Sequence, residues 1–469
     1  MKMPSMKPTL TLCIAGLLLA PLTGLHAAEA PKPGAKPNIV LLLADDLGYG
    51  ELGCYGGKVA TPHLDRLAQE GQRWTQFYAN SCVCSPTRAA LLTGRYPQRA
   101  GVNTALVQPI QDNEGLAPEE WTLAEALREA GYRTGLIGKW HLGSSAERHP
   151  LRQGFDEFTG CLSGMIDHTS HADKMGETDW WQGEERLMEP GYVTHLIERH
   201  AVDFIDRQKE QPFFLYLAFT TPHSPYTAPG ARPVWKLGVG NGGDNAKEPD
   251  ALEGRAALVR AMDDAVGKVM DAVSRKGVGK ETLVIFLSDN GAPGRYKNNP
   301  VFIGDTGGLR GQKFDLYEGG IRVPAIFHWP GRIAPCVVAD PAITMDIMPT
   351  LLKLAGSAVM PPRAFDGVDL FPALMQGQRL PQRDLFWSFK KLCAIRAGDA
   401  KLVRTDALGK NPEAKPKTEL FDLSKDRAES LDLSAGSTAQ VEDFARRLDR
   451  WQKDVESGPK TEGKRALTK

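Results

Sequence analysis

Continuously apolar runs recur along the chain, and each is followed at once by polar side chains. A short run of this kind, bounded by turn residues, is typical of a strand that is buried on both faces of a sheet. Four such runs predict strands, at residues 39–43, 134–137, 213–219 and 283–287. They lead into Asp45-Asp46, Gly138-Lys139-Trp140-His141, Thr221-Pro222-His223 and Ser288-Asp289-Asn290. Each predicted strand therefore ends in ionisable or metal-binding groups.

Helical patterns lie between these strands. The segment from Thr122 to Glu125 has the spacing of a capping box, and Gly131 is a suitable helix stop. Residues 256–275 have apolar side chains at helical spacing. Alternating strands and helices predict an α/β fold with a largely parallel central sheet covered on both faces. Ligands of such sheets bind beyond the carboxyl ends of the strands, so the four polar segments are expected to share one site.

The pattern changes beyond about residue 375. The remaining chain has short strand-like runs and a charged final helix, at residues 384–388, 394–396, 401–404, 419–423 and 441–455. We therefore expect a main domain over residues 31–375 and a small C-terminal α+β subdomain over residues 376–469. Residues 141–191 are rich in glycine, histidine and tryptophan, and residues 222–250 are rich in proline and glycine. Both stretches are predicted to be loops at the rim of the site.

The N-terminus has the pattern of a signal peptide. Lys2 and Lys7 precede an apolar stretch over residues 10–22, and the small-residue segment 27–30 follows. The apolar stretch is shorter than the roughly 20 residues that a membrane-spanning helix needs. The sequence thus predicts that residues 1–30 are removed and that the mature protein is exported to the periplasm or the cell exterior without stable membrane insertion.

Charge and cysteine content narrow the class of protein. Fifty-seven basic and fifty-seven acidic residues cancel, which argues against a protein that coats nucleic acid through bulk charge. An anionic ligand would therefore have to bind in a pocket with local positive charge. The seven cysteines are too scattered for a disulfide framework or a zinc cluster, although one pair could still form a bridge after export.

Two acidic segments are candidates for a metal site. Asp45-Asp46 and Asp289-Asn290 together supply three carboxylates and an amide oxygen, the hard ligands that Ca²⁺ or Mg²⁺ prefers over zinc. Acidic pairs after a strand often only cap the next turn. Two such pairs at two strand ends favour a metal.

The segment from Cys84 to Arg88 has the pattern of a helix start. Ser85 is able to cap, and Pro86 suits the first helical position. An ordinary N-cap explains those two residues but not Cys84 and Arg88, which would lie near the positive end of the helix dipole, where anions bind. From the residues alone, Cys84 could be a thiolate nucleophile or play another part.

The motif Cys84-x-Pro86-x-Arg88, continued to Gly94 and Arg95, resembles the signature of type I sulfatases. In that family a maturation enzyme oxidises the cysteine to formylglycine. The similarity extends over most of the mature chain, through the acidic pair and the segments Gly138-Lys139-Trp140-His141, Thr221-Pro222-His223, Ser288-Asp289-Asn290-Gly291 and Gly311-Gln312-Lys313. The resemblance implies an alkaline-phosphatase-like α/β sandwich in which residues 31–375 form the catalytic domain.

The resemblance also implies a set of roles. Ca²⁺ would be held by Asp45, Asp46, Asp289, Asn290 and the modified Cys84. Arg88 and His141 would orient the formylglycine hydroxyls, and Lys139 and Lys313 would neutralise the sulfuryl group. His223 would protonate the leaving alcohol, and His141 would later accept the proton that releases sulfate. Taken singly, each side chain has a plain structural explanation as a turn, surface or strand-end residue.

The substrate is the least defined prediction. Residues 164–171 are similar to a segment of sulfatases of the N-acetylgalactosamine-4-sulfatase kind that borders the sugar pocket, and His168 stands where that group often has an aromatic. Trp180, Trp181 and Trp235 lie in predicted rim loops, where they could stack on sugars. We expect a sulfated glycan, with an aryl sulfate as surrogate. The alternatives are a phosphate or phosphonate ester hydrolase of the same superfamily, against which Lys139 and Lys313 argue as sulfate ligands, and an inactive glycan-binding homologue.

Overall fold

A computed structural model describes residues 36–107, 110, 113–239, 245, 248, 250–294, 302–357, 362–405 and 417–457. These residues belong to one compact unit, Lys36–Lys469. The predicted signal peptide, residues 1–30, lies outside the described residues, and the domain boundary near residue 375 stays a prediction. Within the described ranges, no helix has the length and apolar character needed to cross a membrane.

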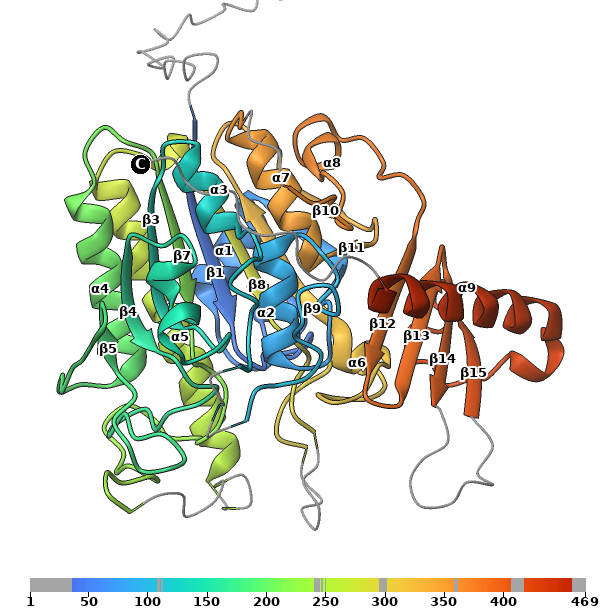
Figure 1. The fold of residues 1–469 in the computed structure, drawn as a ribbon, viewed down its shortest axis with the longest axis horizontal. Coiled ribbons are helices and arrows are strands. Elements are labelled where there is room, and N and C mark those ends of the chain that lie inside the picture. The colour runs from blue at the N-terminus through green and yellow to red at the C-terminus, as the bar shows by residue number, and fades with distance from the viewer. Residues whose placement is uncertain are drawn as a thin grey trace, which may run out of the picture. The chain divides into compact units, whose positions relative to one another are not determined.

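The four predicted strands are confirmed, and they lie side by side. They are β1 (Asn38–Ala44), β3 (Arg133–Lys139), β7 (Phe213–Ala218) and β8 (Thr282–Ser288), all parallel in the order β8-β1-β7-β3. The register pairs Leu43 with both Ala218 and Leu287. The carboxyl ends of these strands therefore lie level at one edge of the sheet (Figure 1).

Seven further strands complete an eleven-stranded sheet. They are β2 (Gln72–Tyr78), β4 (Glu157–Cys161), β5 (Trp181–Gln182), β6 (Glu185–Arg186), β9 (Arg322–His328), β10 (Cys336–Val338) and β11 (Ala342–Ile343). Only β9, β5 and β6 run antiparallel to their neighbours. The prediction of a loop over residues 141–191 is wrong in part, because β4 to β6 lie within it. These strands are too short to give a clear pattern, and pairing of β4 with β3 stabilises them.

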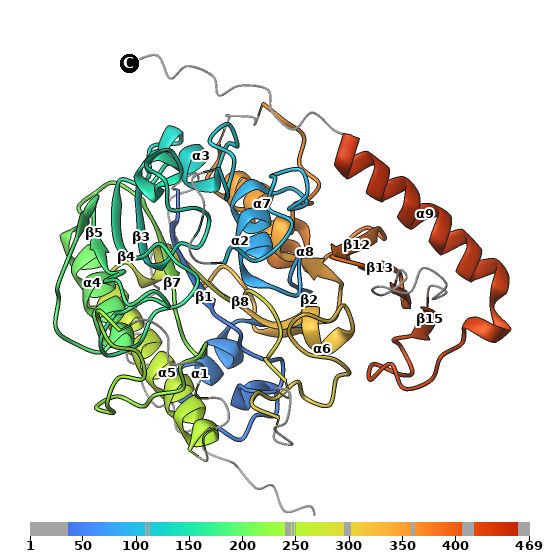
Figure 2. The same ribbon diagram turned by 60° about the horizontal axis from the view of Figure 1, so that its bottom comes forward.

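Helices cover both faces of the sheet, as predicted. One face carries α2 (Cys84–Thr93), α3 (Leu123–Glu129), α7 (Ile347–Leu354) and α8 (Phe371–Gln376), and the other carries α1 (Pro62–Glu70), α4 (Val193–Arg207) and α5 (Ala251–Arg275). Alternate side chains of β1 explain the two cores: Ile39 and Leu41 enter the first, and Val40 and Leu42 the second. The predicted capping box at Thr122 and Glu125 is present. Figure 2 shows α2 and α7 together on one side of the strands.

The C-terminal part forms a second, antiparallel sheet. Its strands β12 (Asp384–Phe389), β13 (Leu392–Ala397), β14 (Ala400–Thr405) and β15 (Lys417–Asp422) pair in sequence order, and α9 (Thr438–Ser457) packs on them. All four predicted strands and the final helix are thus confirmed. Trp387, Leu402 and Leu448 belong to this core, which continues to Tyr78 in β2 of the main sheet and to Ile321, just before β9.

A buried cluster of charges also joins the two sheets. The ammonium group of Lys401 in β14 lies 2.9 Å from a carboxylate oxygen of Glu318, in α6 (Glu318–Ile321), and 2.9 Å from one of Glu429. All three side chains are inaccessible to solvent. Arg322 adds a second cation on Glu318. The C-terminal sheet is therefore tied to the segment after β8 by ion pairs as well as by apolar contacts.

Candidate functional site

The four polar segments meet at the carboxyl edge of the main sheet. The ammonium group of Lys139 donates to Asp45 Oδ2 at 2.6 Å, and that of Lys313 donates to Asp46 Oδ2 at 2.8 Å. None of the predicted site residues is more than 7% exposed. Buried charges are tolerated only when they are paired. The two ion pairs therefore form a buried charged centre at this edge of the sheet.

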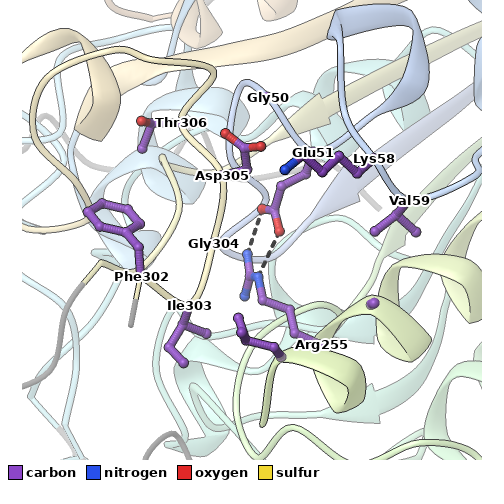
Figure 3. A pocket seen from close by; sticks show the side chains of 12 residues that line it. Gly50, Glu51, Lys58, Val59, Arg255, Phe302, Ile303, Gly304, Asp305 and Thr306 are labelled. Atoms are coloured by element: carbon purple, nitrogen blue, oxygen red, sulfur yellow. Dashed lines mark hydrogen bonds and ion pairs between the residues drawn. The ribbon is translucent and has the colours of Figure 1, made fainter. Parts of the chain in front are cut away.

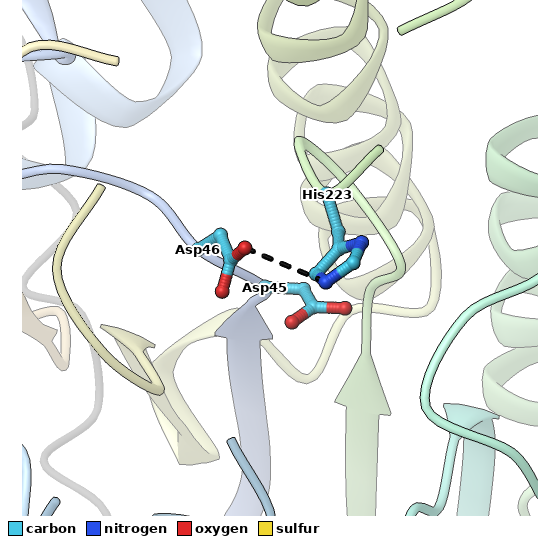
Figure 4. Close-up of side chains that lie close together, drawn as sticks. All are labelled: Asp45, Asp46 and His223. Atoms are coloured by element: carbon cyan, nitrogen blue, oxygen red, sulfur yellow. Dashed lines mark ion pairs between the residues drawn. The ribbon is translucent and has the colours of Figure 1, made fainter. Parts of the chain in front are cut away.

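Asp46 and His223 face each other across this centre. Figure 4 shows the two side chains converging from the loops after β1 and β7, with Asp45 beside them. His223 Nε2 lies 3.5 Å from Asp46 Oδ2, and oxygen or nitrogen atoms of all three side chains lie within 4.8 Å of one another. Asp46 has a φ of 67°, a strained conformation for a residue other than glycine. The fold therefore holds this carboxylate in place at a cost in backbone energy.

Cys84 is the first residue of α2, and the predicted cap is wrong. Val83 occupies the N-cap position without a side-chain hydrogen bond, and the hydroxyl of Ser85 instead accepts from the amide of Leu106. Burial raises the pKa of the Cys84 thiol, although Lys139 and Lys313 act in the opposite direction. A raised pKa disfavours the thiolate nucleophile that the sequence left open.

Arg88 joins the helix to the carboxylates. Its guanidinium donates through Nε and Nη2 to Asp289 Oδ2, at 3.0 and 2.8 Å, and through Nη1 to the carbonyl of Lys139. Burial raises the pKa of Asp289, and the Asp45 carboxylate adds to this effect, whereas Arg88 counters it. The other oxygen of Asp289 accepts from the amide of Asp46. Both carboxylate oxygens of Asp289 thus accept hydrogen bonds from protein groups, which fix the orientation of the side chain.

The predicted metal ligands fit a hard cation. Asp45 Oδ1 and Asn290 Oδ1 are buried and accept no hydrogen bond from the residues that the structure describes. The amide nitrogen of Asn290 donates to Asp46 Oδ1 at 2.8 Å, which turns its oxygen the other way. Buried oxygens without a donor are costly, and a divalent cation would satisfy both of them. The donor set contains carboxylate and amide oxygens only, which suits Ca²⁺ or Mg²⁺.

Lys313 and His223 form a close pair. The Lys313 ammonium lies 3.2 Å from His223 Nε2, and the other ring nitrogen lies 2.9 Å from the carbonyl of Ser224. Burial lowers the pKa of His223 to about 3; Asp46 opposes this shift, and Lys313 adds to it. His223 is therefore neutral near pH 7, with Nδ1 donating to Ser224 and Nε2 accepting from Lys313.

His141 has one bonded and one unbonded ring nitrogen. Its Nε2 lies 2.9 Å from the carbonyl of Leu106, so Nε2 carries the proton. The buried Nδ1 has no hydrogen-bond partner in the described part of the chain. Burial, reinforced by Lys139, lowers the pKa of His141 well below its usual value. A side chain at Gly164 would collide with the ring, since an added Cβ would lie 2.4 Å from Nε2. His141 is thus held as a neutral base with a free lone pair.

Known proteins share both the sequence and the fold of this chain. The sequence model of the sulfatase family matches residues 37–357. The chain belongs to the sulfatase family. The N-acetylgalactosamine-6-sulfatase of Canis lupus familiaris is 38% identical over 406 residues, 82% of this chain and 74% of that protein. Arylsulfatase A of Homo sapiens is 35% identical over 478 residues, 91% of this chain and 88% of the relative.

A solved structure agrees with this family. Ps i-CgsB in complex with k-i-k-neocarrahexaose has a TM-score of 0.77 and 28% sequence identity, over 91% of this sulfatase and 95% of that chain. The motif-based resemblance and the α/β fold are thereby confirmed. The protein is a sulfuric ester hydrolase, and this interpretation holds over the phosphate or phosphonate hydrolase and the inactive homologue.

His168 contacts the backbone of the loop that carries His223. Its Nε2 lies 3.2 Å from the carbonyl of His223, so it donates to that oxygen, and its ring lies 5.7 Å from that of Tyr192. Only 1% of the side chain is exposed. His168 therefore supports the backbone of His223 in this structure, and its predicted contact with substrate stays a prediction.

Arg255 and Glu51, which the sequence did not single out, stabilise two loops of the charged centre. Arg255 donates to the carbonyls of Asp46 and Pro222, at 2.7 and 2.8 Å, and pairs with Glu51. These bonds link the loop after β1 to the loop of His223. Figure 3 shows the pair on the wall of a cavity of about 520 Å³. No local pattern reveals the pair, because its members lie 204 positions apart.

The tryptophans of the predicted rim loops are mostly structural. Trp180 and Trp235 are buried, so the prediction that they stack on sugars is wrong for these two residues. The indole of Trp180 donates to Glu189, and Trp181 is half-buried beneath the guanidinium of Arg186. Composition places aromatics in a loop but does not say which way they point.

Proposed function

We propose that this sulfatase removes sulfate from glycans with a formylglycine made from Cys84 and a bound Ca²⁺. Ca²⁺ would be held by Asp45, Asp46, Asp289, Asn290 and the modified residue. The observation that carries the proposal is a pair of buried oxygens, Asp45 Oδ1 and Asn290 Oδ1, that accept no hydrogen bond from the described residues. They lie in the same centre as the two lysines, Lys139 and Lys313, that oppose the effect of burial on the pKa of the Cys84 thiol. The names of the relatives, which include N-acetylgalactosamine-6-sulfatase, support a sulfated sugar as substrate.

The charges of the centre suit an anionic ester. The three carboxylates are matched by three cations, Arg88, Lys139 and Lys313. Ca²⁺, when bound, would acidify the hydrate of the formylglycine aldehyde and leave an excess of positive charge. Lys139 and Lys313 would then exchange their carboxylate contacts for the sulfate oxygens and stabilise the charge that develops there.

Three residues would orient groups and move protons. Arg88, fixed by its two bonds to Asp289, would orient the nucleophile that Cys84 provides. His223 would be freed at Nε2 when Lys313 turns from it to the sulfate ester; this nitrogen would then take up a proton from solvent and pass it to the leaving alcohol. His141 would accept a proton at its unbonded Nδ1 when sulfate leaves.

The proposal includes export and maturation. The signal peptide predicted at residues 1–30 would carry the chain to the periplasm or the cell exterior, and a formylglycine-generating enzyme would act on Cys84. In the folded protein Cys84 is buried within α2. We therefore infer that the modification precedes folding, since the thiol must be reached by another enzyme.

Matched substrates test the proposed reaction. We expect p-nitrophenyl sulfate to be hydrolysed with a kcat/KM at least about 100-fold above that of p-nitrophenyl phosphate. The ionised nucleophile and a singly charged sulfate ester would balance the excess positive charge that Ca²⁺ brings, whereas a doubly charged phosphate ester would leave a buried negative charge. Initial rates measured with protein from its native host provide the comparison. Equal rates, or faster phosphate release, would show that the centre is not built for sulfate.

The metal proposal has its own prediction. Glu51→Gln is expected to weaken Ca²⁺ binding about 10- to 100-fold, because Arg255 would lose the charge that fixes it against the Asp46 carbonyl. Titration calorimetry on protein stripped with a chelator measures the affinity. Glu253→Gln is the control, since Glu253 is an exposed residue of α5 paired with Arg260. Absence of Ca²⁺ binding by the unaltered protein would contradict the proposed site, and equal affinities would contradict the role of Glu51.

A further inference from the structure

An exposed aromatic ring lies at the edge of the buried charged centre. Phe314 directly follows Lys313 and is 52% exposed, whereas Lys313 is 7% exposed. The centroid of its ring is 5.5 Å from the Lys313 ammonium, which itself contacts Asp46 and His223. Among the large hydrophobic side chains that are exposed in the described ranges, it is the one aromatic. The ring therefore borders the place where the sulfate ester would bind.

The backbone at Phe314 is strained in a way that stability alone does not explain. Its φ is 80°, a conformation that glycine adopts freely and that is rare for a bulky residue. The segment is pinned there, because the amide of Phe314 donates to the carbonyl of Cys82 and that of Lys313 to Ala292. A half-exposed phenyl ring in this conformation costs energy without filling the core. Such strain is usually found where a side chain serves a ligand.

The C-terminal sheet supports the ring and adds a charge. Phe389, at the end of β12, is 3% exposed and packs against Phe314 with ring centroids 6.2 Å apart. Lys390 follows at the tip of the hairpin, with a φ of 55°. Its ammonium lies 5.1 Å from the centre of the Phe389 ring, and within the described part of the chain it forms no ion pair. The exposed cation and the exposed ring thus both lie against Phe389.

We propose that Phe314 and Lys390 form a sugar subsite next to the scissile sulfate. The free face of Phe314 would stack on the apolar face of a sugar ring, and Lys390 would bind a second sulfate or carboxylate on the glycan. This subsite rests on the proposed sulfatase function and adds a preference for multiply charged glycans. The ring comes from the loop between β8 and α6, and the charge comes from the C-terminal sheet, so the docking of that sheet helps to define specificity.

The inference is tested with Phe314→Gly in the full-length protein. Glycine fits the φ of 80° without strain, so the variant is expected to melt at the same or a higher temperature. The substrates are singly and doubly sulfated galactose and N-acetylgalactosamine oligosaccharides, with p-nitrophenyl sulfate as the reference. On the oligosaccharides we expect kcat/KM to fall about tenfold, mainly through KM, and to fall less on the reference. Phe314→Tyr keeps the ring and is expected to keep most of the oligosaccharide activity.

Lys390→Gln tests the charge. We expect it to reduce the preference for doubly over singly sulfated oligosaccharides about three- to tenfold and to weaken the salt dependence of KM. Leu431→Ala, which alters another exposed hydrophobic residue, is the control and is expected to match the unaltered protein.

Several outcomes would overturn the subsite. The first is unchanged oligosaccharide kinetics in Phe314→Gly, which would leave the proposed function standing. The second is hydrolysis of p-nitrophenyl sulfate but of no oligosaccharide by the unaltered protein, which would leave the proposed formylglycine mechanism standing but not the glycan substrate. A dimer that Phe314→Gly dissociates, with unchanged kinetics, would assign the ring to self-association instead. An unaltered, matured protein inactive on every sulfate ester would overturn the proposed function and the subsite together.

Discussion

Replacing Cys84 by alanine is expected to lower sulfate ester turnover by roughly four to six orders of magnitude, because the proposed precursor of the nucleophile would be lost. The fold should survive, since the substitution removes one buried sulfur atom at the start of α2 and leaves the surrounding ion pairs intact. Initial rates on p-nitrophenyl sulfate and a thermal melt measure the two effects. Binding of Ca²⁺ by the variant is expected to weaken but to persist, because the side chains of Asp45 and Asn290 remain.

Cys82 supplies a matched control for this experiment. It is a second buried and free cysteine, two residues away, and burial raises the pKa of its thiol. Cys82→Ala should therefore lose some stability but keep turnover. Mass spectrometry of the tryptic fragment over residues 74–88 of the unaltered protein should show an aldehyde or its hydrate at position 84 and an alkylated thiol at 82. Appreciable turnover by Cys84→Ala would refute the formylglycine mechanism.

Replacing Lys401 by methionine is expected to destabilise the fold by about 3–5 kcal/mol, the usual cost of removing one partner from a buried ion pair. Lys401 is the cation between Glu318 and Glu429, and all three are buried. Denaturant unfolding at constant pH measures the loss. Lys425→Met is the control, because Lys425 forms an exposed pair with Asp422 and should be replaceable without measurable effect.

The loss should grow with pH. Burial raises the pKa of Glu429 above its ordinary value of 4.5, with Lys401 opposing the shift and Glu318 adding to it. A group with a raised pKa stabilises the fold while it is protonated, and that stability is lost as the pH rises from its unfolded pKa through the higher folded one. Among the residues that the structure describes, Lys401 is the cation that pairs with Glu429, so an ionised Glu429 would lose this partner in the variant. Lys401→Met should therefore be more destabilising at pH 8 than at pH 5, and an equal loss at both would contradict the proposed charge state.

The sequence by itself determined the layout of the main sheet and most of the candidate site. The apolar runs predicted β1, β3, β7 and β8, and the polar residues that follow them were correctly predicted to meet at one edge of the sheet. These strands and their ends are predictable because a few consecutive residues determine whether a strand is buried and where it stops. Parallel strands then bring their carboxyl ends to one edge of the sheet. The motif at Cys84 gave the family for the same reason, since its residues are local.

Only the tertiary structure decided how these residues pair and which side chains are accessible. Arg88 reaches Asp289 across 201 positions, and Arg255 reaches Glu51 across 204, contacts that depend on the strand order and not on any local pattern. The buried state of Trp180 and the exposed, strained state of Phe314 likewise follow from packing around them. The type of a side chain limits the chemistry that it can perform. Its burial and its partners decide which role it has, and these depend on elements that lie far apart in the chain.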